Sequence, residues 1–197
     1  MITQPIRLIP EDRCEQMKHR TFELLETVGI EARHESVLKH ISGRGVQVDF
    51  ESGRARFPRK LVEECLEMMP ETVRFGDRRG TVYDLPTGQG EFFVRGGTGA
   101  YNYLQEDGQV RKTTLDDVRT LARLYERIDN IEILAAPFAH DAPPQCTDVF
   151  LVGTILKNAT KHHWIQPYNT GSIKYLNELI LLSANGDKQM LRQAAPM

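Results

Sequence analysis

Hydrophobic positions in the first third of the chain recur at helical spacing between turn-forming residues. Between residues 10 and 28 the apolar side chains fall on one helical face, and Gly29 follows as a C-terminal stop. A shorter helix is expected over residues 34–42. A third is expected over residues 58–69, where Pro58 suits the first turn. The pattern therefore predicts three short amphipathic helices.

Alternation with a period of two predicts β-hairpins between and after these helices. Val46, Val48 and Phe50 alternate with polar residues, a turn follows, and the alternation resumes up to Phe57. A second hairpin is expected where residues 101–104 and 109–111 flank the turn Glu106-Asp-Gly108. Further short strands are expected elsewhere in residues 73–110, including residues 91–94.

From residue 114 onward, helical and strand patterns take turns. Thr114 is the expected N-cap of a helix that runs to residue 128, and a nearly continuous apolar strand follows over residues 131–136. A helix around residues 149–156, a strand over 162–168 and a helix over 172–184 complete the series. Apolar strands that alternate with helices are typical of βα units around a parallel sheet covered on both faces. The fold class is therefore predicted to be α/β.

Composition excludes several classes of protein. The chain has 197 residues, with 25 Lys and Arg against 27 Asp and Glu, a formal net charge of −2. A near-neutral balance of this kind argues against nonspecific binding to nucleic acid, which needs a basic face. No apolar run approaches the roughly 18 residues of a membrane span, and the N-terminus lacks the pattern of a secretory signal. We therefore expect no nucleic acid and no membrane among the partners.

The three cysteines point to a reducing compartment. Cys14, Cys65 and Cys146 are far apart, odd in number and outside any CxxC spacing. A disulfide framework and a cysteine zinc site are both disfavoured by this pattern. Cys146 lies at the start of an expected helix, but no partner base is identifiable for nucleophilic catalysis. The sequence thus predicts a cytoplasmic protein.

A glycine-rich segment around Gly96 and Gly97 is the first candidate for ligand contact. Glycines after a strand suggest a nucleotide loop, as in a nucleotide-dependent methyltransferase, only if a helix opens directly behind them. Here Tyr101 and a hairpin follow instead, and a helix that began at Gly99 would restore the nucleotide hypothesis. The preferred interpretation is a backbone turn at a strand end, where a ligand approaches closely.

Polar residues after two expected parallel strands form the second candidate. His140 follows the strand over residues 131–136, and Gln166 and Tyr168 end the next strand. Ligands of parallel α/β folds gather at the carboxyl ends of strands, so these side chains are expected on one rim. The alternatives stay open that Asp141 merely caps a turn and that residues 166–169 are a polar loop leading to a helix.

No catalytic residue and no metal site can be assigned from the residues alone. His162 and His163 are adjacent on an expected strand, so their side chains point to opposite faces and cannot reach one metal ion. We expect surface or strand-edge histidines here. The sequence therefore predicts no metal site, and it leaves the catalytic residues unknown.

The order of several segments resembles a known family. The matching stretches, quoted as they stand, are Phe22-Glu-Leu-Leu-Glu-Thr-Val-Gly-Ile30, Gly45-Val-Gln-Val-Asp49, Arg56-Phe-Pro-Arg-Lys-Leu-Val62, Phe93-Val-Arg-Gly-Gly-Thr-Gly-Ala100, Thr114-Leu-Asp-Asp-Val118, Leu121-Ala-Arg-Leu124 and Asp129-Asn-Ile-Glu-Ile133. Their order and spacing resemble the N-terminal portion of the trimethylamine–corrinoid methyltransferase (MttB-like) family. No single motif among them is diagnostic.

That resemblance implies an architecture. The fold would be a (β/α)8 barrel of the TIM type, with residues 1–90 as an N-terminal helical cap with small hairpins and residues 91–197 as the first βα units of an incomplete barrel. A complete barrel typically needs about 250 residues, and family members are much longer than this chain. The position of the pyrrolysine that some members carry lies outside the matched part, so no catalytic residue is carried over.

The resemblance also implies an activity. A methylamine or a quaternary amine, such as trimethylamine or a glycine betaine-like compound, would give a methyl group to a cob(I)alamin-bearing partner protein, so that this chain itself binds no cofactor. Tyr101, Tyr103, Trp164 and Tyr168 would supply the aromatic surround that a quaternary ammonium favours. The competing hypothesis is a non-catalytic α/β binding or assembly domain derived from the same fold. A homo-oligomer is compatible with either.

Overall fold

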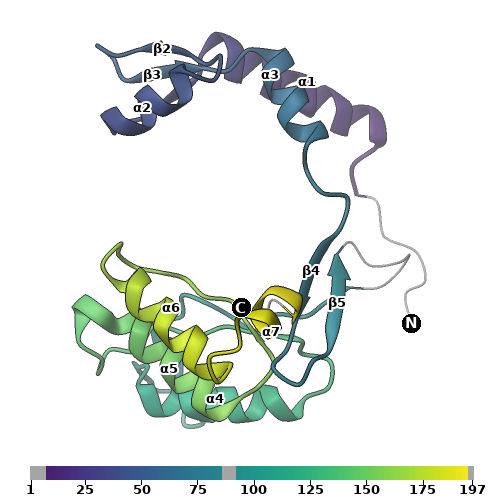
Figure 1. The fold of residues 1–197 in the computed structure, drawn as a ribbon. Helices are drawn as coiled ribbons and strands as arrows, with labels where there is room; N and C mark the ends of the chain where they lie inside the picture. The colour runs from purple at the N-terminus through teal and green to yellow at the C-terminus, as the bar shows by residue number, and fades with distance from the viewer. Residues whose placement is uncertain (1–7, 86–91, 195–197) are drawn as a thin grey trace. The chain divides into compact units, whose positions relative to one another are not determined.

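Two compact units make up the chain in the computed structural model, which describes residues 8–85 and 92–194. The first unit comprises Met1–Glu71 and the second Thr72–Met197 (Figure 1). The expected domain boundary near residue 90 stays a prediction. By internal contacts the division falls after Glu71, because the hairpin that follows packs onto the second unit: the Phe75 ring lies 4.9 Å from that of His162.

The first unit contains the helices and the hairpin that the hydrophobic pattern predicts. Its elements are α1 (Glu11–Thr27), β1 (Ile30–Glu31), α2 (Glu35–Ser42), β2 (Gln47–Asp49), β3 (Arg54–Arg56) and α3 (Arg59–Glu67). The three strands form an antiparallel sheet in the order β1-β3-β2. Strand β1, only two residues long, is not predicted by the sequence pattern.

A small apolar cluster holds this unit together. Leu38 of α2, Val46 and Ala55 of β3 are its buried members, and their burial on one side of the sheet fixes the hairpin register. Gly29 ends α1 with φ of +73°, and a Cβ there would lie 2.3 Å from the carbonyl oxygen of Ala55. The predicted glycine stop is confirmed, and the close approach of β3 gives it a second physical reason.

The second unit begins with two hairpins and continues with alternating helices and short strands. Its elements are β4 (Val73–Gly76), β5 (Val82–Leu85), β6 (Asn102–Leu104), β7 (Val110–Lys112), α4 (Leu115–Arg127), β8 (Ile133–Leu134), η1 (Pro144–Cys146), α5 (Thr147–Asn158), β9 (His162–His163), α6 (Ser172–Ser183) and α7 (Lys188–Ala194). The pairs β4–β5 and β6–β7 are antiparallel. The sequence pattern does not predict α7.

Parallel pairing in the second unit confirms the predicted βα arrangement in part. Strands β8 and β9 are parallel, with Leu134 opposite His163, and Arg95 forms a parallel bridge with Ile133. The prediction covers only the first βα units of a TIM-type barrel, and the barrel type itself stays a prediction: the described residues form small separate sheets, and no closed barrel occurs among them. Three parallel strand positions are too few to close a barrel, for which about eight strands are needed.

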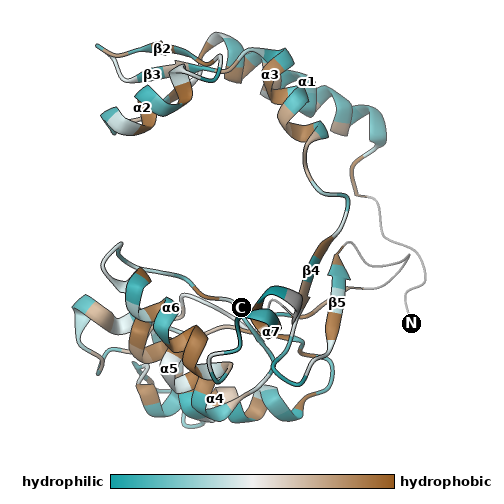
Figure 2. Ribbon diagram, viewed as in Figure 1, coloured by the Kyte–Doolittle hydropathy of each residue, from teal (hydrophilic) through white to brown (hydrophobic). Residues whose placement is uncertain are grey.

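The core of the second unit lies between these strands and the helices α4 and α5. Leu134 is fully buried and packs in one cluster with Val118 and Ala122 of α4 and Leu151 and Ile155 of α5. Figure 2 shows hydrophobic residues concentrated on α5 and α6, with a more polar α4 beside them. Burial of these side chains on the helix-facing side of the strands fixes which strand residues face the other way.

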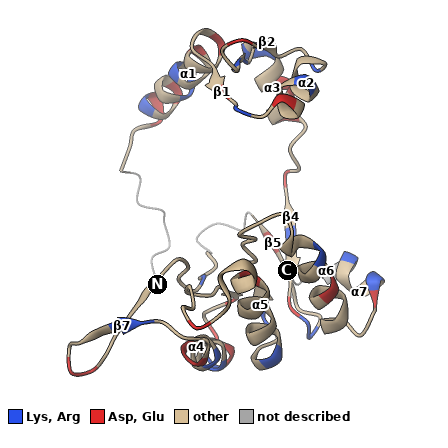
Figure 3. Ribbon diagram, turned by 90° about the vertical axis from the view of Figure 1, so that its left-hand side faces the viewer, with Lys and Arg blue, Asp and Glu red and all other residues tan. Residues whose placement is uncertain are grey.

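Helix α4 begins at a capping box, as the sequence predicts for Thr114. The Thr114 side chain accepts a hydrogen bond from the Asp117 amide, and the Asp117 carboxylate accepts one from the Thr114 amide. Arg111 forms a bidentate ion pair with Asp117, at 2.6 and 2.7 Å. The Arg111 guanidinium holds the pKa of the Asp117 carboxyl well below its usual range. Figure 3 shows basic and acidic residues interspersed on this helix.

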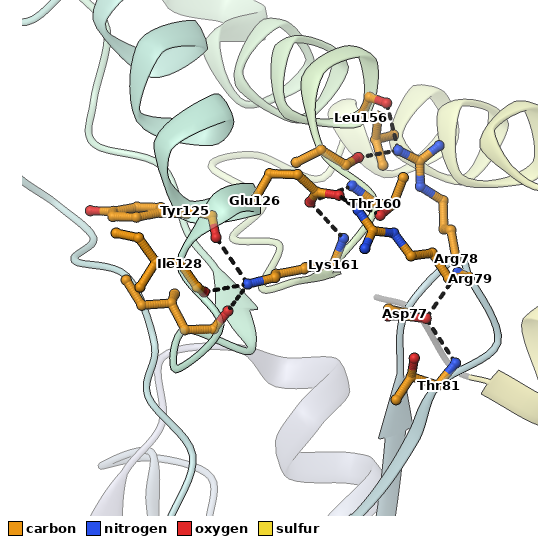
Figure 4. A network of polar contacts seen from close by, with 12 residues as sticks. Asp77, Arg78, Arg79, Thr81, Tyr125, Glu126, Ile128, Leu156, Thr160 and Lys161 are labelled. Atoms are coloured by element: carbon orange, nitrogen blue, oxygen red, sulfur yellow. Dashed lines mark hydrogen bonds and ion pairs between the residues drawn. The ribbon is translucent and has the colours of Figure 1, made fainter.

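A polar network lies where α4 ends and β8 and β9 begin (Figure 4). The Lys161 ammonium donates hydrogen bonds to the carbonyl oxygens of Tyr125, Ile128 and Ile131, at 3.0, 2.6 and 2.7 Å. These carbonyls belong to the C-terminal end of α4 and the turn after it, where the partial negative charge of the helix dipole favours a cation. Lys161 thus ties the end of α4 to the start of β9.

Glu126 and the turn of the β4–β5 hairpin extend this network. The Glu126 carboxylate accepts hydrogen bonds from the amide and the hydroxyl of Thr160, at 2.9 and 2.6 Å, and pairs with Arg79. Arg78 donates to the carbonyl oxygens of Leu156, at 2.6 Å, and Ala159, at the end of α5. Burial lowers the pKa of the Arg78 guanidinium. The network lies at the amino ends of β8 and β9.

Two further expectations concern the helices and the cysteines. No helix within residues 8–85 and 92–194 is long and apolar enough to cross a membrane. Cys14 and Cys65 are exposed, Cys146 is half-buried, and all three are free thiols.

Candidate functional site

Four ring side chains gather where the chain leaves the parallel strand positions. The Phe138 ring lies 5.3 Å from that of Tyr101, 5.2 Å from that of His140 and 5.8 Å from that of Tyr168, between ring centroids. We call these four residues the aromatic rim. Tyr101, His140 and Tyr168, which the sequence singles out as candidates, thus lie together around Phe138; that they contact a ligand stays a prediction.

Backbone hydrogen bonds fix the loop segments that carry these rings. The Phe138 amide donates to the Ala100 carbonyl at 2.9 Å, and the His140 amide donates to the Thr113 carbonyl at 2.9 Å. His140 Nε2 lies 3.0 Å from the carbonyl oxygen of Tyr101. Because a carbonyl only accepts, Nε2 carries the proton of that contact.

A small cavity adjoins the aromatic rim. It has a volume of about 20 Å³, and Tyr168, Gln166, Trp164, Thr98 and His163 are among the residues that line it. A space of this size holds about one water-sized group. A methylated amine is too large for it and would have to rest against the exposed rings above. Tyr101 is 59% and Tyr168 40% exposed, so both rings offer such a surface.

Asp148 positions Tyr168 from inside the cavity wall. Its side chain is 1% exposed and accepts hydrogen bonds from the Tyr168 amide and the Ser172 hydroxyl, both at 2.8 Å. Its own helix supplies a third donor, the Val149 amide, at 3.0 Å. A buried carboxylate with three donors is satisfied by hydrogen bonding. It therefore locks the chain after β9 to the first turns of α5 and α6.

Tyr168 keeps its phenol proton in this setting. Partial burial raises the pKa of the Tyr168 hydroxyl, and the neighbouring Tyr101 and Asp148 raise it further. A neutral phenol presents an electron-rich ring face without a full charge, which suits contact with a cationic methyl group.

The two candidate glycines differ in their surroundings. Gly96 is buried, and a Cβ there would lie 2.7 Å from Cε2 of Tyr125, so its lack of a side chain is explained by packing against α4. Gly97 has nothing within 4 Å of an added Cβ. No helix opens behind them, since β6 at Asn102 is the next element, so the condition for a nucleotide loop is not met.

His163 departs from expectation. The two adjacent histidines point to opposite faces, as predicted, but His163 is 2% exposed and is not a surface residue. Its Nδ1 has no hydrogen-bond partner among the described residues. His162 Nδ1 lies 3.2 Å from the carbonyl oxygen of Gly76. Among residues 8–85 and 92–194 no cluster of His, Cys, Asp and Glu could hold a metal ion.

The other aromatic candidates are divided between two places. Trp164 lines the cavity and carries the Arg95 guanidinium 4.3 Å from its ring centre, whereas Tyr103 lies on β6 beneath Arg111 and outside the aromatic rim. Sequence reasoning missed Phe138, Asp148 and Arg95. Phe138 lies in the same loop as His140, which was the one available signal; the others depend on nonlocal contacts.

Comparison with known proteins gives one family. The family model for trimethylamine methyltransferase (MTTB) matches residues 2–193. A trimethylamine methyltransferase MttB of Desulfitobacterium hafniense is 25% identical over 171 residues, 86% of this chain and 34% of the relative. A glycine betaine methyltransferase of the same species is 26% identical over 156 residues, 78% and 32%. The MttB of Methanosarcina barkeri is 24% identical over 196 residues, 95% and 39%.

The match extends over nearly the whole chain but only part of each relative. This chain spans about a third of the length of the relatives that it matches. The matched region contains both compact units, including the aromatic rim and the cavity beside it. The chain belongs to the trimethylamine methyltransferase family, and it corresponds to the N-terminal portion of that family's members.

Proposed function

We propose that this chain supplies the amine-binding rim of a methyltransferase. The substrate is trimethylamine or a quaternary amine such as a betaine, and the methyl acceptor is a corrinoid held by a separate partner protein. The observation that carries this proposal is the convergence of Tyr101, Phe138, His140 and Tyr168 from three chain segments. Family membership supports the reaction class, and two relatives are named for these two amines.

The rings would hold the methylated nitrogen by cation–π attraction. A cation over an aromatic face within about 6 Å gains roughly 0.5–2 kcal/mol, depending on its desolvation. Tyr101 and Tyr168 flank Phe138, so more than one face is available to one ammonium group. During transfer the carbon–nitrogen bond breaks and its electron pair stays on nitrogen, so a quaternary ammonium leaves as a neutral tertiary amine.

Access for the partner is consistent with the exposure of the rim. A reduced corrinoid, when the partner protein brings it, supplies the electron pair that takes up the methyl group. The rings of this chain would then hold the methyl groups that stay on nitrogen, and the methyl group that is transferred would have to remain accessible to the partner on an open side. Tyr101 and Tyr168 remain 59% and 40% exposed, which leaves such an open side. A complete (β/α)8 barrel, with further βα units beyond β9, would provide the remaining walls.

Binding and demethylation by the complete protein test this proposal. Titration calorimetry with trimethylamine and with glycine betaine should give binding of at least one ligand, weakened about 3- to 30-fold by Tyr168→Ala, since one cation–π contact is lost. Tyr175→Ala is the matched control, because Tyr175 is an exposed tyrosine of α6 outside the aromatic rim. It should leave binding unchanged.

The reaction itself is followed by the demethylated amine. Mass spectrometry should detect this product only when the complete protein and free cob(I)alamin, as the acceptor probe, are both present. If an amine binds but no demethylated product forms with the probe or with a corrinoid protein, the alternative of a non-catalytic binding domain is favoured. If neither amine binds, the rim is not an amine site.

A further inference from the structure

We propose that Arg95 selects amines that carry a carboxylate, so that the substrate is a betaine rather than trimethylamine. This inference rests on the proposed function, since it names the substrate class of the same site. Its basis is the contact of the Arg95 guanidinium with two residues that line the cavity next to the aromatic rim: it lies 4.3 Å from the ring centre of Trp164, and its Nη1 lies 3.5 Å from the Thr98 hydroxyl.

Trp164 and Thr98 connect Arg95 to the aromatic rim. Both line the small cavity, and Tyr168 lines it too. Arg95 and Trp164 come from the two strand positions that flank β8, as the parallel bridge to Ile133 and the β8–β9 pairing show. In TIM barrels the side chains of alternate strands share an interior layer. The pair therefore occupies the face of the strands opposite the helix-facing core.

The charge of Arg95 is not neutralised by the part of the chain that the structure describes. No carboxylate of these residues forms an ion pair with it, although Arg79 and Arg111 each have one. Arg95 is exposed. A guanidinium held against a ring keeps its edge donors free, and those donors match a carboxylate in bidentate geometry.

The positive charge of Arg95 distinguishes a substrate that carries a carboxylate from one that carries only an ammonium group. A guanidinium that has no carboxylate partner within residues 8–85 and 92–194 repels a simple trimethylammonium ion, which has no group that could pair with it. Glycine betaine carries a carboxylate one methylene away from its ammonium group. Its carboxylate would meet Arg95 and Thr98 while its methyl groups lie on Tyr168 and Phe138. Because the Arg95 guanidinium already covers one face of the Trp164 ring, the ammonium group of the substrate would bind to the rings of the aromatic rim instead.

Ligands that differ only at the carboxylate test this inference. The complete protein is titrated with glycine betaine, with choline, in which a hydroxymethyl group replaces the carboxylate, and with tetramethylammonium. Glycine betaine should bind about 10- to 100-fold more tightly than choline, because a hydrogen-bonded charge pair contributes that much. Arg95→Gln should remove this preference: glycine betaine should bind more weakly, whereas choline should bind as well or somewhat more tightly, because the repelling charge is gone. Arg95→Lys should retain part of the preference.

Control variants separate recognition from structure. Arg119→Gln removes an exposed arginine of α4 that pairs with Asp116, and it should keep the full preference for glycine betaine. Thr98→Val keeps the charge of Arg95 and should reduce the preference only in part. If the Arg95→Gln variant still binds choline, it is folded.

Each contrary outcome identifies which proposal fails. Equal binding of choline and glycine betaine by the wild-type protein overturns the role of Arg95 and keeps the amine site. An equal loss for all three ligands in Arg95→Gln also overturns it, because the residue then acts through structure alone. Absence of binding by all three ligands overturns the amine site itself, and the role of Arg95 with it.

Discussion

Burial on β9 is expected to keep the imidazole of His163 neutral far into the acid range. The side chain is 2% exposed and lies on the same sheet face as its parallel partner Leu134, which is fully buried. Burial, followed by the smaller effects of the neighbouring His162 and Arg78, lowers the pKa of the His163 ring from 6.5 to about 3. A cation buried here would lose most of the hydration that stabilises it in water.

The magnitude follows from the difference between the two pKa values. Protonation of the buried ring costs about 5 kcal/mol more than protonation in water, at about 1.4 kcal/mol for each pH unit between 6.5 and 3. Because the folded pKa lies below the unfolded one, the unfolded chain takes up the proton first as the pH falls. The contribution to stability is therefore complete above about pH 6.5 and is lost progressively down to about pH 3.

A ring-specific NMR titration measures this pKa directly. The complete protein is labelled with ¹³C at histidine Cε1, and His163→Gln identifies the signal of the buried ring among the six histidines of this chain. His40→Gln, which removes an exposed ring of α2, checks the assignment. The His163 signal should keep the chemical shift of a neutral ring down to pH 4.5. A midpoint near pH 6.5 in the folded protein would refute the reasoning.

Unfolding experiments test the same claim through stability. Between pH 7 and pH 4.5 the free energy of unfolding of the wild-type protein should fall by about 3 kcal/mol through this one group. The fall corresponds to the roughly two pH units between 6.5 and 4.5, at about 1.4 kcal/mol each. His163→Leu keeps the position apolar and removes the titration, so its loss of stability over this interval should be smaller by that amount. An identical pH dependence in the two proteins would contradict the predicted coupling.

Three other substitutions test contacts outside the titration of His163, each by the midpoint of thermal unfolding. Gly96→Ala should destabilise the protein by about 1–3 kcal/mol, because its Cβ would meet the ring of Tyr125, whereas Gly97→Ala should be tolerated; equal effects would contradict the packing role. Lys161→Met should cost about 2–4 kcal/mol through three lost hydrogen bonds, and a change below 0.5 kcal/mol would refute it. Thr114→Ala should cost about 1 kcal/mol as a lost N-cap, and an unchanged midpoint would exclude the cap.

Local elements could be predicted because their causes are local. The helical spacing of apolar residues, the N-cap at Thr114 and the stop at Gly29 act within one or two turns of chain, and the structure confirms them. The hairpins follow from alternation and turn residues in the same way. The parallel order of β8 and β9 was also predictable, since a helix between two strands favours parallel pairing.

Side-chain surroundings could not be predicted where they depend on segments far apart in sequence. Strand parity showed that His162 and His163 face opposite ways, but only the covering helices decide which face is buried. Gly96 was predicted to admit a ligand, and the observed reason for the glycine is a ring from α4. Burial arises from tertiary packing, about which sequence periodicity carries no information beyond the choice of face.

The sequence by itself determined the order of helices and hairpins, the α/β class and the family, because these follow from local periodicity and from the linear order of motifs. The sequence predicted that His140 and Tyr168 share one rim, but only the tertiary structure decided that Phe138 lies at its centre, that Tyr101 joins it and that Arg95 lies on Trp164. Parallel strands bring their carboxyl ends to one edge, so residues more than 30 positions apart become neighbours there. That convergence is a property of the packed strands and loops and has no counterpart in any single segment.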